Sequence, residues 1–530
     1  MAIEEKDTTV AHYKMAKFGV NLNKNILELV PEEAVNTQNC VWKNGMVKRG
    51  GQTLIDTDQV VDDKKIVGLH RFYKKDGTKQ TIATAGTITK YLDAGTWTNV
   101  KTGLTDSTQT FMTTIGWDDS VYGANGTDAP WRWTGSAVST ISNAPADTLQ
   151  FLQYRDRVLS ITGGDLTWSG SFTIASWLSV ANANVRPDTK LNGMVYHSSN
   201  DSKTGIDTKI LLAGDNGMYL FFGTDLDFSG TPDYVLAPLA YSVGCNAPRT
   251  MIWTPLGTMW LGIDRQVYML PFASATPIPV GNKITSVIRG EEGIEKIPAA
   301  QLANACAVYH DGFYKLSVAR DGQTTNNAQW WLDVTRMHKD ENAHHGPWFG
   351  PMLGQTINVF AKQAGAGDVG ELLAGESSAK GYVYEVGDDN TFSDIDPSDA
   401  SAKAIQVFYQ TFYNDLTGNP HLAKDIHFIE AELLDVLGTV NIDFEDITGT
   451  IKSGDSFGLS GNAIFWDDAF WGEEDWSNSA PTRQKVEIDP VIQTRRLSIL
   501  VKHNSSVDRF ELYGISAEVK EQSDIYAVTM

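Results

Sequence analysis

The densest group of chemically versatile side chains lies between residues 466 and 476, where tryptophans alternate with carboxylates. Its members are Trp466, Asp468, Trp471, Glu473 and Trp476. Two carboxylates can act as the acid and base of a glycosidase, and indole rings offer flat surfaces for sugar stacking. An acidic loop whose indoles cover the rim of a β domain would have the same composition. We interpret the segment as a protein-contact loop, because aromatic residues are enriched at interfaces.

Other segments resemble known sites but lack the surroundings that the chemistry requires. Residues 454–458 read Gly-Asp-Ser-Phe-Gly, the Gly-x-Ser-x-Gly pattern of hydrolase nucleophiles. Such a serine needs a strand before it and a helix after it, whereas a strand-like run follows here. The carboxylates at 394–399 and 443–446 can offer oxygens to calcium, but neither segment has the spacing of a calcium-binding loop. We interpret these segments as turns and loops.

A compact group of histidines lies at His338, Glu341, His344 and His345. On a helix, positions 338, 341 and 345 would share one face and could bind a metal ion. The Gly346-Pro347 pair leaves little length for a helix, so we interpret the group as an exposed loop. The sequence therefore predicts no catalytic residue, no metal site and no cofactor, and a protein that is not an enzyme.

The composition is that of an acidic globular protein. Lys and Arg number 43 against 65 Asp and Glu in 530 residues, a formal net charge of −22. Holding DNA through its phosphates requires clustered basic residues, so no specific DNA binding is expected. Three widely spaced cysteines, Cys40, Cys245 and Cys306, predict neither a disulfide framework nor a zinc site. We expect no membrane span and no signal peptide.

Short strand patterns recur in clusters of four along the chain. Clear clusters begin near residues 65, 108 and 149, and looser ones near 190, 248, 304 and 358. A period of about forty residues is typical of four-stranded propeller blades. Tight turns join the first two strands of several clusters, at Asp118-Asp119, Arg155-Asp156, Leu256-Gly257 and Asp311-Gly312. A sandwich made of hairpins would show the same turns, but the regular period favours a propeller.

We therefore predict an all-β protein in three parts. An N-terminal arm spans 1–60 and contains a hairpin at Asn44-Gly45. A β-propeller of six to eight blades spans 61–390. A polar, acidic linker follows at 388–399, and longer strand patterns predict a C-terminal antiparallel β-sandwich-like domain at 402–525.

The N-terminal segment resembles the opening of tail hub or nozzle proteins of tailed bacteriophages, the short-tailed ones in particular. The residues that carry the resemblance are Gly19-Val20-Asn21, Asn25, Pro31-Glu32-Glu33-Ala34, Asn39, Asn44-Gly45-Met46-Val47 and Arg49-Gly50-Gly51. Tyr154-Arg155-Asp156-Arg157-Val158, the stretch from Thr411 to Lys424 with the strands to Asp443, and the Trp466–Trp476 phrase are similar to later segments of the same family. None of these motifs names a catalytic residue.

The resemblance implies a structural protein of the virion. Family members close the channel below the portal and adaptor as a hexamer, and carry a propeller with additional β domains. The expected function is a ring that extends the DNA channel and retains packaged DNA until ejection. Its partners would be further copies of the chain, portal and adaptor proteins, and tail fibre or tip proteins. Viral DNA would pass without specific binding, because like charge repels it. The alternatives are a propeller glycosidase using Asp468 and Glu473, or a carbohydrate-binding receptor module.

Overall fold

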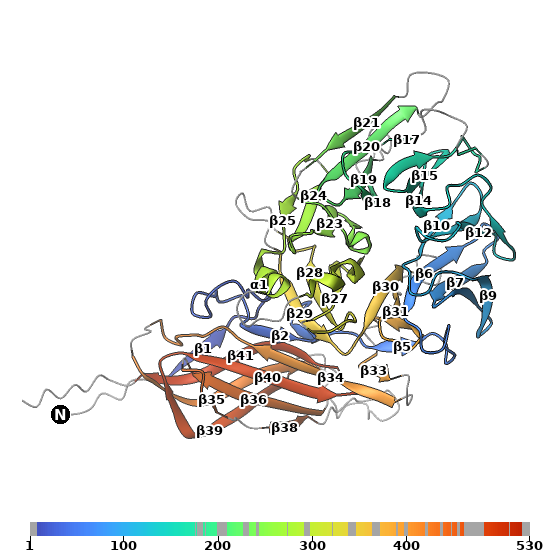
Figure 1. Ribbon diagram of the computed structural model, residues 1–530. Helices are drawn as coiled ribbons and strands as arrows, with labels where there is room; N and C mark the ends of the chain where they lie inside the picture. The colour runs from blue at the N-terminus through green and yellow to red at the C-terminus, as the bar shows by residue number, and fades with distance from the viewer. Residues whose placement is uncertain are drawn as a thin grey trace, which may run out of the picture.

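The computed structural model shows a ring of β-sheets above a two-layered β domain (Figure 1). It describes all residues except 1–7, 175, 178–183, 186, 199–208, 226–232, 240–242, 273, 291–296, 321, 338–345, 363–371, 388–390, 397–400, 419–421, 435–437, 447, 453–455, 460–481, 508 and 522–530.

Six four-stranded antiparallel sheets form six blades of a β-propeller, and the first four strands of an 11-stranded sheet form the seventh. Blades 1 to 3 are β6 (Ile66–Tyr73), β7 (Lys79–Ala85), β8 (Ile88–Asp93), β9 (Thr96–Thr102); β10 (Phe111–Ile115), β11 (Ser120–Ala124), β12 (Trp131–Trp133), β13 (Val138–Thr140); and β14 (Thr148–Tyr154), β15 (Arg157–Thr162), β16 (Asp165–Trp168), β17 (Asn184–Val185). Blades 4 to 6 are β18 (Leu191–His197), β19 (Lys209–Gly214), β20 (Met218–Asp225), β21 (Asp233–Pro238); β22 (Ile252–Thr254), β23 (Gly257–Leu261), β24 (Val267–Pro271), β25 (Ile278–Pro279); and β26 (Cys306–His310), β27 (Phe313–Val318), β28 (Ala328–Asp333), β29 (Trp348–Leu353). Blade 7 is β30 (Ile357–Lys362), β31 (Leu372–Glu376), β32 (Val383–Val386) and β5 (Gln52–Leu54).

The blades close into a ring. The first strand of each blade contacts the first strand of the next, and β30 contacts β6 to complete the circle. Strand β5 comes from the N-terminal segment and pairs with β32, so the two ends of the propeller meet in one sheet. Pairing of this kind attaches the N-terminal segment to the last blade and closes the ring. The predicted all-β propeller is therefore confirmed, with seven blades.

The hairpin turns follow from the local sequence. Asp119, Arg155 and Asp311 have positive φ angles of 48°, 55° and 51°, and each lies between the first two strands of a blade. Asn and Asp tolerate this left-handed region better than most residues, and Gly312 at φ 80° completes the turn after Asp311. In blade 5 the turn falls one residue before the predicted position, because Gly257 pairs with Thr254 as part of β23.

Helical turns are few and short. They are η1 (Pro248–Thr250), η2 (Asn282–Ile284), α1 (Thr285–Arg289) and η3 (Ala299–Asn304). The first lies between blades 4 and 5, and the other three lie between blades 5 and 6. Among the helices of the described residues, none is long and apolar enough to cross a membrane.

The C-terminal domain is a sandwich of two sheets. One sheet contains β1 (Thr9–Tyr13), β3 (Cys40–Trp42), β4 (Met46–Lys48), β35 (Lys424–Leu434), β39 (Thr482–Thr494) and β41 (Glu511–Glu521). The other contains β2 (Asn36–Gln38), β33 (Ser393–Asp396), β34 (Ser401–Gln410), β36 (Gly438–Asp446), β37 (Ile451–Lys452), β38 (Ser456–Leu459) and β40 (Leu497–Ser505). Strand β33 also pairs with β5, so the second sheet continues into blade 7.

The N-terminal residues do not form the separate arm expected at 1–60. Strands β1, β3 and β4 join one sheet of the sandwich, β2 joins the other, and β5 joins the propeller. These strands have three to five residues and cannot bury an apolar face alone, so they pair with longer strands far along the chain. The expected linker at 388–399 likewise contains β33. The Asn44-Gly45 hairpin is present between β3 and β4.

One hydrophobic core runs through both parts of the molecule. It includes Ala16 and Val20 from the N-terminal segment, Trp260 and Trp348 from the propeller, and Ile429 from the sandwich. A shared core of this kind fixes the propeller against the sandwich, whereas separate domains meet through smaller and more polar surfaces. The cysteines Cys40, Cys245 and Cys306 are buried and free, and burial raises the pKa of each thiol to about 12.

Candidate functional site

The loop expected to make protein contacts lies outside the described residues. This applies to Trp466, Asp468, Trp471, Glu473 and Trp476, and also to the histidine group at 338–345. Among the described residues, no cluster of three or more His, Cys, Asp or Glu side chains is arranged to hold a metal ion.

The serine of the Gly-x-Ser-x-Gly pattern lies in a sheet. Ser456 begins β38, and it pairs with Asn441 of β36 in an antiparallel ladder. A nucleophile elbow instead joins a strand to a helix. The geometry around Ser456 therefore does not match that motif.

The carboxylates considered for calcium already have partners where the structure describes them, and Asp399 lies outside the described residues. Asp443 forms an ion pair with Lys502 at 2.6 Å. Asp446 accepts hydrogen bonds from the backbone and hydroxyl groups of Thr448, which form the turn after β36. Asp396 forms ion pairs with Lys380 and Lys403. These side chains stabilise turns and strand pairs.

The junction between propeller and sandwich centres on Arg49. Its Nη1 donates to Asp394 Oδ1 at 2.9 Å and its second terminal nitrogen also pairs with that carboxylate. Its Nε donates to Asn39 Oδ1 at 3.1 Å, and Nη2 donates to the carbonyl oxygen of Leu353. The side chain of Arg49 has no exposed surface. This one guanidinium thus joins the N-terminal segment, blade 6 and β33.

A second polar cluster fixes the N-terminal segment to blade 5. Glu33 accepts a hydrogen bond from Asn21 at 3.0 Å and forms an ion pair with Lys283 at 3.1 Å. Burial raises the pKa of Glu33, but Lys283, Asn21 and Lys24 outweigh it and leave that pKa below its usual value. Burial lowers the pKa of Lys283. The pair is ionic and nearly enclosed, which resists separation of these elements.

The centre of the propeller is crossed by side chains. Arg249, at the start of blade 5, donates through its guanidinium to the carbonyl oxygens of Val67 in blade 1, Thr110 before blade 2 and Asn358 in blade 7. Gln109 donates to the carbonyl oxygen of Ala303 at 2.8 Å, which joins the approach to blade 2 with η3. The propeller axis is therefore bridged rather than open.

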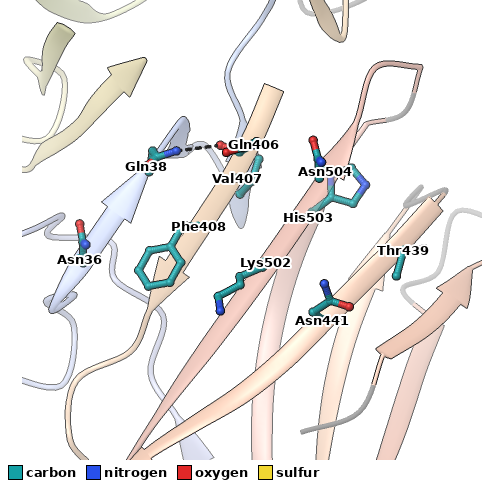
Figure 2. Close-up of a pocket in the computed structure, with 10 residues that line it drawn as sticks. All are labelled: Asn36, Gln38, Gln406, Val407, Phe408, Thr439, Asn441, Lys502, His503 and Asn504. Carbon is teal, nitrogen blue, oxygen red and sulfur yellow. Dashed lines mark hydrogen bonds between the residues drawn. The ribbon is translucent and has the colours of Figure 1, made fainter. Parts of the chain in front are cut away.

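A shallow hollow of about 650 Å³ lies on the outer face of the second sandwich sheet. Figure 2 shows side chains from four neighbouring strands, β2, β34, β40 and β36, around it. Half of its lining residues are amides, and the others include one phenyl ring, one lysine and one histidine. The lining residues are Asn36, Gln38, Gln406, Val407, Phe408, Thr439, Asn441, Lys502, His503 and Asn504. A second hollow of about 420 Å³ shares Gln38 and Gln406 with it and extends to blade 7.

Sequence reasoning missed these surfaces for different reasons. The sequence does contain a pattern for the hollow, because more exposed residues alternate with buried ones on its strands, as in Gln406-x-Phe408 and Lys502-x-Asn504. No local sequence pattern identifies the role of Arg249, because its partners are backbone carbonyl oxygens from three distant segments.

The architecture and the site geometry define a seven-bladed β-propeller protein with a β-sandwich built from both ends of its chain. No family model and no curated protein matches the sequence. Among solved structures, similar folds occur in YCF48 bound to D1 peptide, with a TM-score of 0.36 and 10% identity over 62% of this chain and 94% of that one. Sqt1 of Saccharomyces cerevisiae is similar with a TM-score of 0.39 and 7% identity over 66% of this chain and 100% of that one.

Proposed function

We propose that this chain is a structural subunit of the tail or neck of a bacteriophage particle. Copies of it would form a ring, a hexamer by the family resemblance, that extends the DNA channel below the portal and adaptor. The ring would help to retain packaged DNA until ejection. Further partners would be tail fibre or tip proteins, with the loop around Trp466 and Trp476 among the contact surfaces.

The observation that carries the proposal is the structural role of the residues in the resembling N-terminal segment. A Cβ on Gly19 would lie 2.0 Å from the carbonyl oxygen of Trp348, and one on Gly51 would lie 2.0 Å from that of Ser393. Asn39 and Arg49 form the buried junction with Asp394. The segment thus holds propeller and sandwich at a fixed angle. Closed rings need such rigidity, because every subunit repeats the same interface.

Charge and shape support a channel between copies rather than through one chain. Side chains of Gln109 and Arg249 cross the propeller axis, which favours a channel between copies. A ring of six chains with −22 formal charges each would present an acidic lumen if part of that charge faced inward. DNA would be repelled from such a wall and would slide along it.

The test is the native mass of the protein by sedimentation, followed by negative-stain imaging over a range of concentrations. A ring of about six chains with a central hole, and no retention of duplex DNA at low salt, is the expected result. A chain that stays monomeric at every concentration and binds duplex DNA tightly would contradict the proposal.

A further inference from the structure

The hollow on the sandwich presents side chains in two rows across the sheet. One row places Gln38 beside Phe408, Phe408 beside Lys502, and Lys502 beside Asn441. The parallel row places Gln406 beside Asn504, and Thr439 lines the hollow next to Val440, which pairs with His503. The rows lie two residues apart along the strands, or roughly 7 Å. One small ring-shaped ligand unit can therefore touch both rows.

The amides of this surface have unused hydrogen-bonding capacity. Asn36, Gln406, Asn441 and Asn504 are exposed, and within the described part of the chain their side-chain amides form no hydrogen bond with other side chains or backbone groups. Each amide offers two donors and an accepting oxygen. Groups that both donate and accept at short spacing match the adjacent hydroxyls of a sugar, since each hydroxyl also donates and accepts.

The hollow is electrically neutral despite the acidity of the chain. Lys502 is the one charged residue among those that line it, and its ammonium group pairs with Asp443 at 2.6 Å. An anionic ligand would find no free cation here and would be repelled by the net charge of −22. Charge complementarity therefore favours a neutral, polyhydroxylated ligand.

Phe408 adds an apolar surface to this polar row. Its ring is half-buried, between Gln38 and Lys502 in the cross-strand ladder (Figure 2). The C–H face of a sugar ring can lie on such a ring while its hydroxyls reach the flanking amides. Ligand sites typically combine a hydrophobic surface with a few polar groups that fix orientation.

The supporting sheet makes the surface rigid. The alternate residues Val407, Val440 and Val501 on the same strands are buried in the sandwich core. Because these side chains hold three of the strands in place, little conformational entropy is lost when a ligand binds. The adjoining hollow, which shares Gln38 and Gln406, extends the surface toward blade 7 and offers room for more than one sugar unit.

We propose that the outer face of the sandwich, at Gln406, Phe408, Asn441 and Asn504, binds a neutral oligosaccharide or polysaccharide chain. Binding at this face needs no turnover. The inference does not depend on ring formation, so either proposal can fail without the other.

The test is affinity electrophoresis of the full chain through gels that contain one neutral polysaccharide each: a β-glucan, an α-glucan, a xylan, a galactomannan or dextran. Calorimetry with oligosaccharides of the retarding polymer then gives the affinity. We expect retardation by at least one of them. Asn441→Ala and Gln406→Ala should each weaken binding about tenfold, and Phe408→Ala should weaken it more strongly.

Matched controls use the same residue types elsewhere. Phe172 is exposed on the propeller and Asn216 is exposed near blade 4, so Phe172→Ala and Asn216→Ala should leave retardation unchanged. If Phe408→Ala fails to fold, Gln406→Ala and Asn441→Ala still test the proposal, because both residues are exposed.

Three results would overturn the proposal. The first is no retardation by any neutral polysaccharide. The second is retardation that Gln406→Ala and Asn441→Ala leave unchanged, or binding to anionic polysaccharides alone. The third is a fall in the sedimenting mass of the protein on Asn441→Ala, which would assign this face to contacts between copies.

Discussion

Arg49 and Asp394 form a buried ion pair although 345 positions separate them in the chain. The side chain of Arg49 is fully enclosed and that of Asp394 is 9% exposed. The pair ties the segment before β5 to β33, which follows the last blade. It therefore closes the propeller and attaches the sandwich at the same point.

Removing one partner of this pair should destabilise the protein strongly. Arg49→Met leaves the Asp394 carboxylate buried without its cation, which typically costs about 3–5 kcal/mol. Chemical denaturation followed by tryptophan fluorescence measures the loss. The control is Asp106→Asn at the exposed Lys64–Asp106 pair, where we expect a change below about 1 kcal/mol. Equal effects of the two substitutions would show that the junction does not depend on Arg49.

Adding a methyl group at Gly51 should also loosen the junction. Its Cβ would lie 2.0 Å from the carbonyl oxygen of Ser393, so the backbone must shift. Overpacking of this kind costs about 1–3 kcal/mol. Thermal unfolding of Gly51→Ala should show a lower Tm, whereas Gly116→Ala, whose Cβ would meet only the side chain of Gln153 at 3.5 Å, should unfold near the wild-type temperature. A Gly51→Ala protein as stable as wild type would contradict close packing between Gly51 and Ser393.

Arg249 should stabilise the ring of blades. Arg249→Met removes the donors to Val67, Thr110 and Asn358, leaving carbonyl oxygens at the axis without that partner. We expect a loss of at least about 2 kcal/mol and faster hydrogen exchange in β6 and β30. Arg289→Met, at the exposed pair with Asp264, is the control and should leave exchange in those strands unchanged. Unaltered exchange in Arg249→Met would mean that the axis is held by packing alone.

Stability should fall as the pH drops from 7 toward 4. Burial, with Lys209 adding to it, lowers the pKa of His197 to about 4, whereas an unfolded histidine titrates near 6.5. Between these values the unfolded state binds more protons, so acid favours unfolding, by up to about 3 kcal/mol at this site. Unfolding free energies measured across this range give the slope.

A substitution at His197 can show whether this residue causes the pH dependence of the unfolding free energy. His197 is 2% exposed and hydrogen-bonded to Thr258, and His197→Asn keeps a polar group there that does not titrate. This variant should show a shallower dependence on pH than wild type. His12 is exposed on β1, so His12→Gln is the control for removing a histidine that is not buried. An unchanged slope in His197→Asn would exclude this histidine as a cause.

The blades could be predicted because the sequence patterns that define each one lie close together in the chain. Strand lengths, turn residues such as Asp119 and Asp311, and the near-regular period all lie within about forty residues of one another. The predicted cluster starts near 65, 108, 149, 190, 248, 304 and 358 correspond to the seven blades. The N-terminal strands were not placed, since three-residue segments such as β4 and β5 carry no periodic signal long enough to identify a partner.

The sequence by itself determined an all-β protein, its repeated four-stranded units and their turns, because alternation and turn chemistry act between near neighbours. Only the tertiary structure decided that the two ends of the chain share sheets, that Arg49 meets Asp394, that Arg249 bridges the axis and that Gln406, Phe408 and Asn441 form one surface. These contacts join residues that are far apart in the chain, so no local sequence pattern indicates them. They arise because buried charges and unpaired backbone groups must find partners wherever the fold supplies them.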